Sequence, residues 1–165
     1  MLPADAAAEA TLRFGGNTPA VINDQLELAA SHYYDDAVLA ELILLQARDA
    51  APQCLSVYFS LYKFYFYKQK LAQAEQTVLD SLQVAAELGE FTNDLETLTP
   101  TAAPWADVTH PAHFYLFSLK ALAFIRLRLK RADESKQLLD KLAELDPQDQ
   151  VGGSVIRELL QRSVT

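Results

Sequence analysis

Two histidines three residues apart are the part of the sequence best suited to chemistry. His110 and His113 have a His-x-x-His spacing, and Asp107 lies just before them. Imidazole and carboxylate groups are common zinc ligands, so a metal-binding or enzymatic protein that uses these side chains is one hypothesis. Pro111 separates the histidines, however, and no second group of ligands is visible. We therefore expect no metal and no cofactor, and interpret the imidazoles as exposed groups at a helix N-terminus.

Other catalytic motifs are missing from the sequence. Gly152 and Gly153 follow Asp-Gln-Val rather than a strand and precede no lysine, so they do not form a phosphate-binding loop. Cys54 is the only cysteine, and residues 50–57 hold no basic side chain that would activate its thiol. A single cysteine also forms no disulfide within the chain, which fits a reducing cytoplasm. We expect a cytoplasmic protein that is not an enzyme.

Composition narrows the possible partners. The 165 residues include 50% hydrophobic and 22% charged residues, as in ordinary globular domains, and the net charge is −8. An acidic surface repels phosphate backbones, so we expect no nucleic-acid binding. The most apolar segment, residues 114–129, is interrupted by Lys120, Arg126 and Arg128 and is too short to span a bilayer. We therefore expect no membrane association.

Apolar spacing predicts an all-α fold of about seven helices in a single domain over residues 19–165. The predicted ranges are 19–33, 35–49, 53–68, 71–88, 111–130, 132–145 and 152–163. Thr18 and Pro19 are typical of an N-cap and a first helical residue, and Gly89 is typical of the residue that follows a helix. Residues 1–18 are interpreted as a tail or short helix. Residues 90–112, with three prolines and Trp105, are interpreted as a loop insertion.

An internal repeat runs through these helices. The first repeat has a small residue, an apolar residue, another small residue and a helix-ending position. Residues at equivalent positions follow about 34 residues later. A third set follows after another such period, which is lengthened by the insertion at 90–112. The three sets are Ala40, Leu44, Ala47 and Pro52; Ala74, Val78, Ser81 and Ala86; and Ser135, Leu139, Leu142 and Pro147.

The period of this repeat, about 34 residues, is that of tetratricopeptide-repeat (TPR) proteins. On the repeated residues, and on the Leu-Asp-Pro ending at 145–147, the chain resembles this family over residues 19–147. The resemblance implies a stack of antiparallel helix hairpins that binds other proteins. The turn glycine of the family is absent, however, and the insertion 90–112 is foreign to it. A helical bundle without repeats is the alternative.

The resemblance also implies a binding surface, because the first helix of each TPR unit lines the concave face. The residues at those positions are Phe59, Lys63, Phe66, Tyr67, Lys120, Phe124, Leu127 and Arg128. A groove of aromatic and basic side chains is suited to an acidic or amphipathic peptide. The equally weighted alternative is that these aromatics are core. Trp105 either fills the protein's own groove or anchors a partner, and the sequence does not decide between them.

Two longer segments suggest which partner is bound. Residues 113–129 and 145–156 resemble small helical-repeat proteins of nitrogen-fixing bacteria, among them a nitrogenase-associated factor that binds the molybdenum-iron protein. This resemblance implies an adaptor, chaperone or assembly factor whose partner is the nitrogenase molybdenum-iron protein. A type III secretion chaperone of the TPR class, similar in length, acidity and repeat count, is the alternative. The N-terminal tail and the insertion do not fit that class well.

Overall fold

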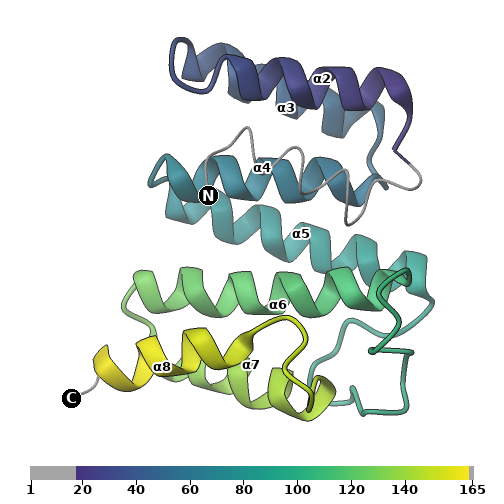
Figure 1. The fold of residues 1–165 in the computed structure, drawn as a ribbon, viewed down its shortest axis with the longest axis vertical. Helices are drawn as coiled ribbons and strands as arrows, with labels where there is room; N and C mark the ends of the chain where they lie inside the picture. The colour runs from purple at the N-terminus through teal and green to yellow at the C-terminus, as the bar shows by residue number, and fades with distance from the viewer. Residues whose placement is uncertain (1–17, 164–165) are drawn as a thin grey trace. The chain divides into compact units, whose positions relative to one another are not determined.

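The computed structural model describes residues 18–163, which form seven α-helices and no strand (Figure 1). The predicted all-α fold is therefore confirmed. Every predicted helix is present, and its ends move by at most two residues. Most of the predicted tail, residues 1–17, lies outside the described range. The helices are α2 (Ala20–Ser31), α3 (Ala37–Ala50), α4 (Leu55–Tyr67), α5 (Leu71–Gly89), α6 (Pro111–Arg128), α7 (Ala132–Leu145) and α8 (Gly153–Ser163).

The chain divides into two compact units, and the boundary lies inside α5, after Thr77. The first unit contains α2, α3, α4 and the beginning of α5. The second contains the rest of α5, the insertion, α6, α7 and α8. The single domain over residues 19–165 stays a prediction. Within residues 18–163, no helix combines the length and apolar character needed to cross a bilayer.

In the first unit, α2 and α3 form a hairpin whose inner faces are apolar and which packs on α4 (Figure 1). The Asp36 carboxylate begins α3 by accepting the Leu39 N–H at 3.0 Å, as an N-cap should. The predicted cap of α2 is wrong, because Pro19 is the cap residue and the helix begins at Ala20. The Thr18 hydroxyl instead pairs with the hydroxyl of Ser56 at 2.9 Å.

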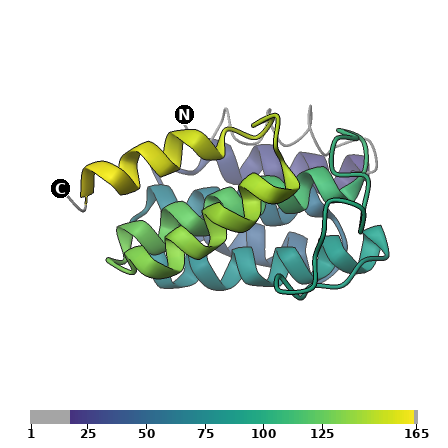
Figure 2. The ribbon, with the colours of Figure 1, turned by 90° about the horizontal axis from the view of Figure 1, so that it is seen from below.

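In the second unit, α6 and α7 form a hairpin, and α8 packs against both helices (Figure 2). The helices of the hairpin approach closely at Ala123 and Ser135, which are fully buried. The Ser135 hydroxyl donates a hydrogen bond of 2.7 Å to the Ala123 carbonyl oxygen. A small side chain is needed here, because a larger one would separate the helices.

Burial agrees with the repeat found in the sequence. The small residues at the first repeat position, Ala40, Ala74 and Ser135, are all fully buried. The next two positions of each repeat are buried as well; they are Leu44, Ala47, Val78, Ser81, Leu139 and Leu142. The repeat therefore marks the buried faces of α3, α5 and α7. Assignment of the chain to the TPR family stays a prediction.

The turns that follow α4 and α6 form without the turn glycine of the TPR family. Gln69 and Lys130, which follow α4 and α6, have φ angles of 61° and 65°. In each turn an N–H reaches back to a carbonyl five residues earlier, from Lys70 to Tyr65 and from Arg131 to Arg126, both at 2.9 Å. This is the hydrogen bond of a Schellman helix ending. Gln69 and Lys130 occupy equivalent positions in the second and third repeats.

The end of α5 differs from the prediction. Gly89 is the last helical residue, and Glu90 takes the left-handed conformation with a φ of 57°. Gly89 is needed for a different reason, because close packing leaves no room for a side chain at this position. A Cβ there would lie 2.5 Å from a ring carbon of Phe91 and 3.1 Å from the His110 ring. The glycine therefore lets the insertion fold back against the helix.

Candidate partner-binding surfaces

The predicted partner-binding residues of α4 lie on the first unit. Phe59 is fully buried, whereas Lys63, Phe66 and Tyr67 are half-buried. The Lys63 ammonium lies 5.4 Å from the centroid of the Phe59 ring and 5.8 Å from that of Tyr67. These three residues are spaced four apart, so α4 itself brings the cation between two rings. Phe59 is therefore part of the core, and the other three keep surface that a partner could contact.

The predicted residues of α6 lie on the second unit. Lys120, Phe124 and Leu127 are half-buried and Arg128 is exposed. The Lys120 ammonium lies 5.5 Å from the Phe117 ring and close to the turn before α8, where a Cβ on Gly152 would be 3.3 Å away. Lys120 therefore already interacts with its own helix and with that turn. Binding of a partner by the residues of α4 and α6 stays a prediction.

Trp105 is packed inside the insertion of the second unit. Its side chain is 4% exposed, and its indole N–H donates to the Thr99 carbonyl oxygen at 3.0 Å. The ring lies 5.2 Å from Phe91 and 6.0 Å from Tyr115, measured between centroids. A buried indole of this kind stabilises the loop and offers a partner almost no surface in this conformation. Binding of a partner through Trp105 stays a prediction.

Polar contacts hold the same loop on the helices. The Tyr115 hydroxyl donates to the Asn93 side-chain oxygen at 2.7 Å, and burial raises the pKa of this phenol. The Lys141 ammonium of α7 donates to the Leu98 carbonyl oxygen at 2.9 Å, and Leu98 is itself fully buried. The insertion is therefore an ordered part of the second unit, attached to α6 and α7 by side chains.

His110, His113 and Asp107 were the candidate metal ligands, and two of them have a local structural role. The ring nitrogen Nδ1 of His110 accepts the Ala112 N–H at 3.0 Å, which makes this histidine the N-cap of α6. Asp107 accepts the Thr109 N–H at 2.9 Å and the Thr109 hydroxyl at 2.7 Å, and these bonds lower its pKa. Among residues 18–163, no group of three or more His, Cys, Asp or Glu side chains could hold a metal ion.

One expectation about the histidines is wrong. Both imidazoles were expected to be exposed, but His113 is only 7% exposed and His110 is half-buried. His113 lies in the first turn of α6, between the buried residues Ala112 and Phe114. Almost all side chains in the first half of α6 are buried, and His113 is buried with them.

A carboxylate that the sequence analysis missed joins α3 to α4 and to the turn before α5 in the first unit. Glu41 accepts a hydrogen bond from the Tyr65 hydroxyl at 2.9 Å and another from the Lys70 ammonium at 2.8 Å. The bond from Lys70 is the main cause of the lowered pKa of Glu41. Burial and the neighbouring carboxylate raise the pKa of Tyr65 to about 12. A glutamate in the middle of an apolar helix was the signal that could have been noticed.

An outward stripe on the first hairpin was also missed. Tyr34, Val38 and Leu42 are 72%, 80% and 50% exposed. Tyr34 lies in the turn before α3, and the other two lie on α3 itself. Apolar spacing predicts a helix over residues 35–49, but it does not show which side of that helix Val38 and Leu42 face. Their spacing relative to the buried Ala40 would have separated the two faces.

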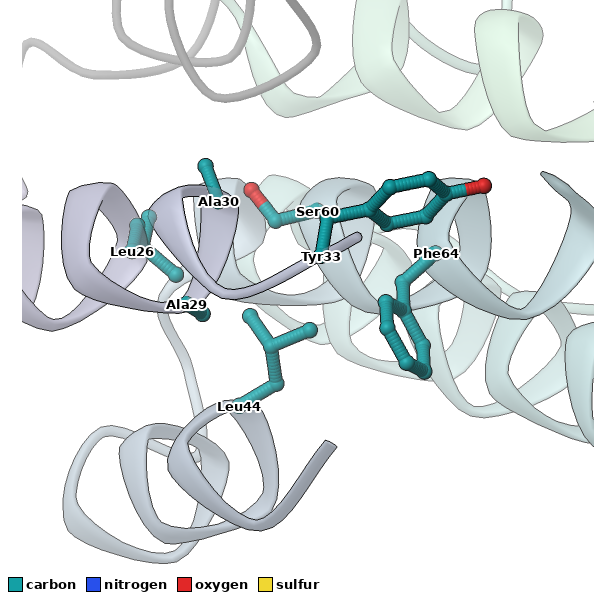
Figure 3. A pocket seen from close by; sticks show the side chains of 7 residues that line it. All are labelled: Leu26, Ala29, Ala30, Tyr33, Leu44, Ser60 and Phe64. Atoms are coloured by element: carbon teal, nitrogen blue, oxygen red, sulfur yellow. The ribbon is translucent and has the colours of Figure 1, made fainter. Parts of the chain in front are cut away.

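A small pocket of about 20 Å³ lies among α2, α3 and α4 (Figure 3). Apolar side chains and the Ser60 side chain line it, and Ser60 is buried. Among the described residues, the Ser60 hydroxyl has no hydrogen-bond partner. A pocket of this size is large enough for about one water molecule and too small for a metabolite. We therefore regard it as a packing defect rather than as a ligand site.

Ser60→Ala is expected to raise the free energy of unfolding by up to about 1 kcal/mol, because a buried hydroxyl without a partner is costly and alanine favours the helix. Ser56→Ala is the matched control on the same helix, since it removes the hydroxyl that pairs with Thr18. It should be the less stable of the two variants by about 1 kcal/mol. Urea unfolding of both variants provides the measurement. A clear loss of stability in Ser60→Ala would mean that a water molecule in the pocket satisfies its hydroxyl.

Comparison with known proteins identifies a relative. The chain is 31% identical over 142 residues to an uncharacterized 19.8 kDa protein in the nifW 5′ region of Azotobacter chroococcum mcd 1. The matched stretch covers 80% of this chain and 74% of the relative. No family model and no solved structure matches the sequence. Similarity over most of both chains shows a common family.

Proposed function

Since the chain belongs to the same family as the protein in the nifW 5′ region of Azotobacter chroococcum, we propose that it acts in nitrogen fixation. Its proposed role is non-catalytic: it binds another protein in the cytoplasm, as an adaptor, chaperone or assembly factor. The proposed partner is the nitrogenase molybdenum-iron protein, which the chain stabilises or helps to assemble. The observation that supports this proposal most directly is the relationship to the protein in the nifW 5′ region.

Two features of the structure support a binding role. Helix hairpins present long side-chain surfaces, which suits protein binding. In addition, several large apolar side chains are exposed, including Val38 and Leu42 in the first unit and Val155 in the second. Exposed apolar side chains that lie close together are typical of interaction surfaces.

The proposed role is tested by purifying the tagged chain from its own cells. One culture grows on dinitrogen and another on ammonium, and the copurifying proteins are identified by mass spectrometry. We expect subunits of the molybdenum-iron protein to be enriched with the chain in the culture that grows on dinitrogen. Recovery of secreted translocators instead would favour a type III secretion chaperone. Recovery of neither would contradict the proposed partner.

A further inference from the structure

The outward side of α3 has the pattern of a helix that packs against another helix. Val38, Leu42 and Leu45 are separated by four and three residues, the spacing of a coiled-coil seam. Successive residues of an α-helix turn by about 100°, so Val38 and Leu42 face away from Ala40, which is fully buried between them. Leu45 is half-buried. We call Val38, Leu42 and Leu45 the α3 stripe.

Acidic residues stand at both ends of the α3 stripe. Asp35 precedes Val38 by three residues, Asp49 follows Leu45 by four, and both are exposed. Residues 18–50 contain six carboxylates and a single arginine or lysine, Arg48. Arg48 follows Leu45 by three residues and is half-buried. One of the six, Glu41, is paired with Lys70, the Asp35 carboxylate contacts the His32 ring, and the Lys68 ammonium lies 5.9 Å from the centroid of the Tyr34 ring. The charge that remains beside the stripe is that of the exposed carboxylates Asp35 and Asp49 at its two ends.

The charges of Asp35 and Asp49 determine which kind of helix can pack against the α3 stripe. In a symmetric dimer formed through the α3 stripe, Asp35 and Asp49 of one copy would meet the same pair of carboxylates of the other copy, whether the helices were parallel or antiparallel. Like charges brought together in an interface oppose association. A helix with an apolar seam and flanking lysines or arginines would meet the same stripe with opposite charges. The charge pattern therefore favours a basic partner over a second copy.

We propose that the α3 stripe binds a basic amphipathic helix of a partner protein. The apolar seam of that helix covers Val38, Leu42 and Leu45, and its basic side chains lie near Asp35 and Asp49. This inference deepens the proposed protein-binding role and rests on it for the existence of a partner. It places the contact on the outward side of α3, which the prediction from the sequence did not include.

A labelled synthetic helix tests the stripe directly. The probe is a fluorescein-labelled peptide of about three heptads, with leucine at positions a and d and lysine at positions e and g. The matched peptide has glutamate in place of lysine. Fluorescence anisotropy should show that the lysine peptide binds the native chain at least about tenfold more tightly than the glutamate peptide. Leu42→Asp should weaken binding of the lysine peptide by about tenfold or more.

Val155→Asp is the control variant, because Val155 is a similarly accessible apolar residue on α8 of the other unit. It should bind the lysine peptide as the native chain does. Circular dichroism checks that both variants stay folded. Equal binding of the lysine peptide to native chain and Leu42→Asp, or equal binding of the two peptides, would overturn the proposal. So would a native dimer, seen by light scattering, that Leu42→Asp converts to a monomer.

The same variant separates this inference from the proposed function. If native chain and Leu42→Asp recover the same nitrogenase subunits from cells in equal amounts, the stripe is not the binding surface and the proposed function stands. If the peptides behave as expected but cells that fix nitrogen yield no nitrogenase subunit, the stripe stands and the proposed partner is wrong.

Discussion

Replacing Trp105 with alanine is expected to lower the free energy of unfolding by about 3–5 kcal/mol, the usual cost of removing a large buried aromatic side chain. Trp105 is packed against Phe91 and Tyr115 and donates a hydrogen bond to Thr99. Alanine would remove these ring contacts, leave the Thr99 carbonyl oxygen without this donor and open a cavity under the insertion. The effect should extend beyond the loop, because Tyr115 belongs to α6.

Urea unfolding followed by circular dichroism measures this loss. Val108→Ala is the matched control, because Val108 lies in the same loop and is exposed. Its effect should stay within about 0.5 kcal/mol. If Trp105→Ala cost less than about 1 kcal/mol, the indole would not be a core residue of the second unit, and its availability to a partner would have to be reconsidered.

Replacing Glu41 with alanine is expected to cost about 2–3 kcal/mol at neutral pH. Two donors, the Tyr65 hydroxyl and the Lys70 ammonium, would lose their acceptor, and Tyr65 is buried. Hydrogen bonds to a charged group contribute about 1.5–3 kcal/mol, and a buried donor without a partner adds its own cost. The free energy of unfolding from urea titration checks this value. Glu96→Gln, an exposed glutamate in the insertion, should change it little.

The contribution of Glu41 should also depend on pH. Its pKa is lower in the folded chain than in the unfolded chain, so the stabilisation is present above the unfolded pKa of about 4.3. It is lost as the pH falls through the folded pKa, where the carboxylate becomes protonated. The difference in stability between native chain and Glu41→Gln should therefore shrink from neutral pH toward pH values of about 3. A difference that stays constant over this range would contradict the assigned ion pair.

The sequence predicted the helices well because their apolar spacing is determined by local geometry. All three small residues at the first repeat position, Ala40, Ala74 and Ser135, proved to be buried. Helix ends were less predictable, since they depend on contacts with residues outside the helix. Gly89 is the residue type that commonly terminates a helix, yet Phe91 and His110 require its missing side chain, and Glu90 makes the left-handed turn instead.

The surfaces were harder to predict than the helices. Aromatic residues cover all sides of α4, so sequence alone could not tell that Phe59 is buried while Phe66 and Tyr67 keep exposed area. Trp105 is buried because it packs against Phe91 and Tyr115. One of these residues precedes it and the other follows it in the sequence, and neither is a close neighbour along the chain. Burial of such a residue follows from tertiary packing, which leaves no periodic signal in a loop.

The buried position of Trp105 makes the two units distinguishable by intrinsic fluorescence. It is the only tryptophan of the chain, and it lies in the second unit, whereas the aromatic residues of the first unit are tyrosines and phenylalanines. Selective excitation of the indole, at wavelengths that tyrosine does not absorb, therefore reports the environment of the insertion and is silent about α2, α3 and α4. Comparison of this emission with circular dichroism, which averages over all helices, would reveal whether the two units lose their structure together or in succession.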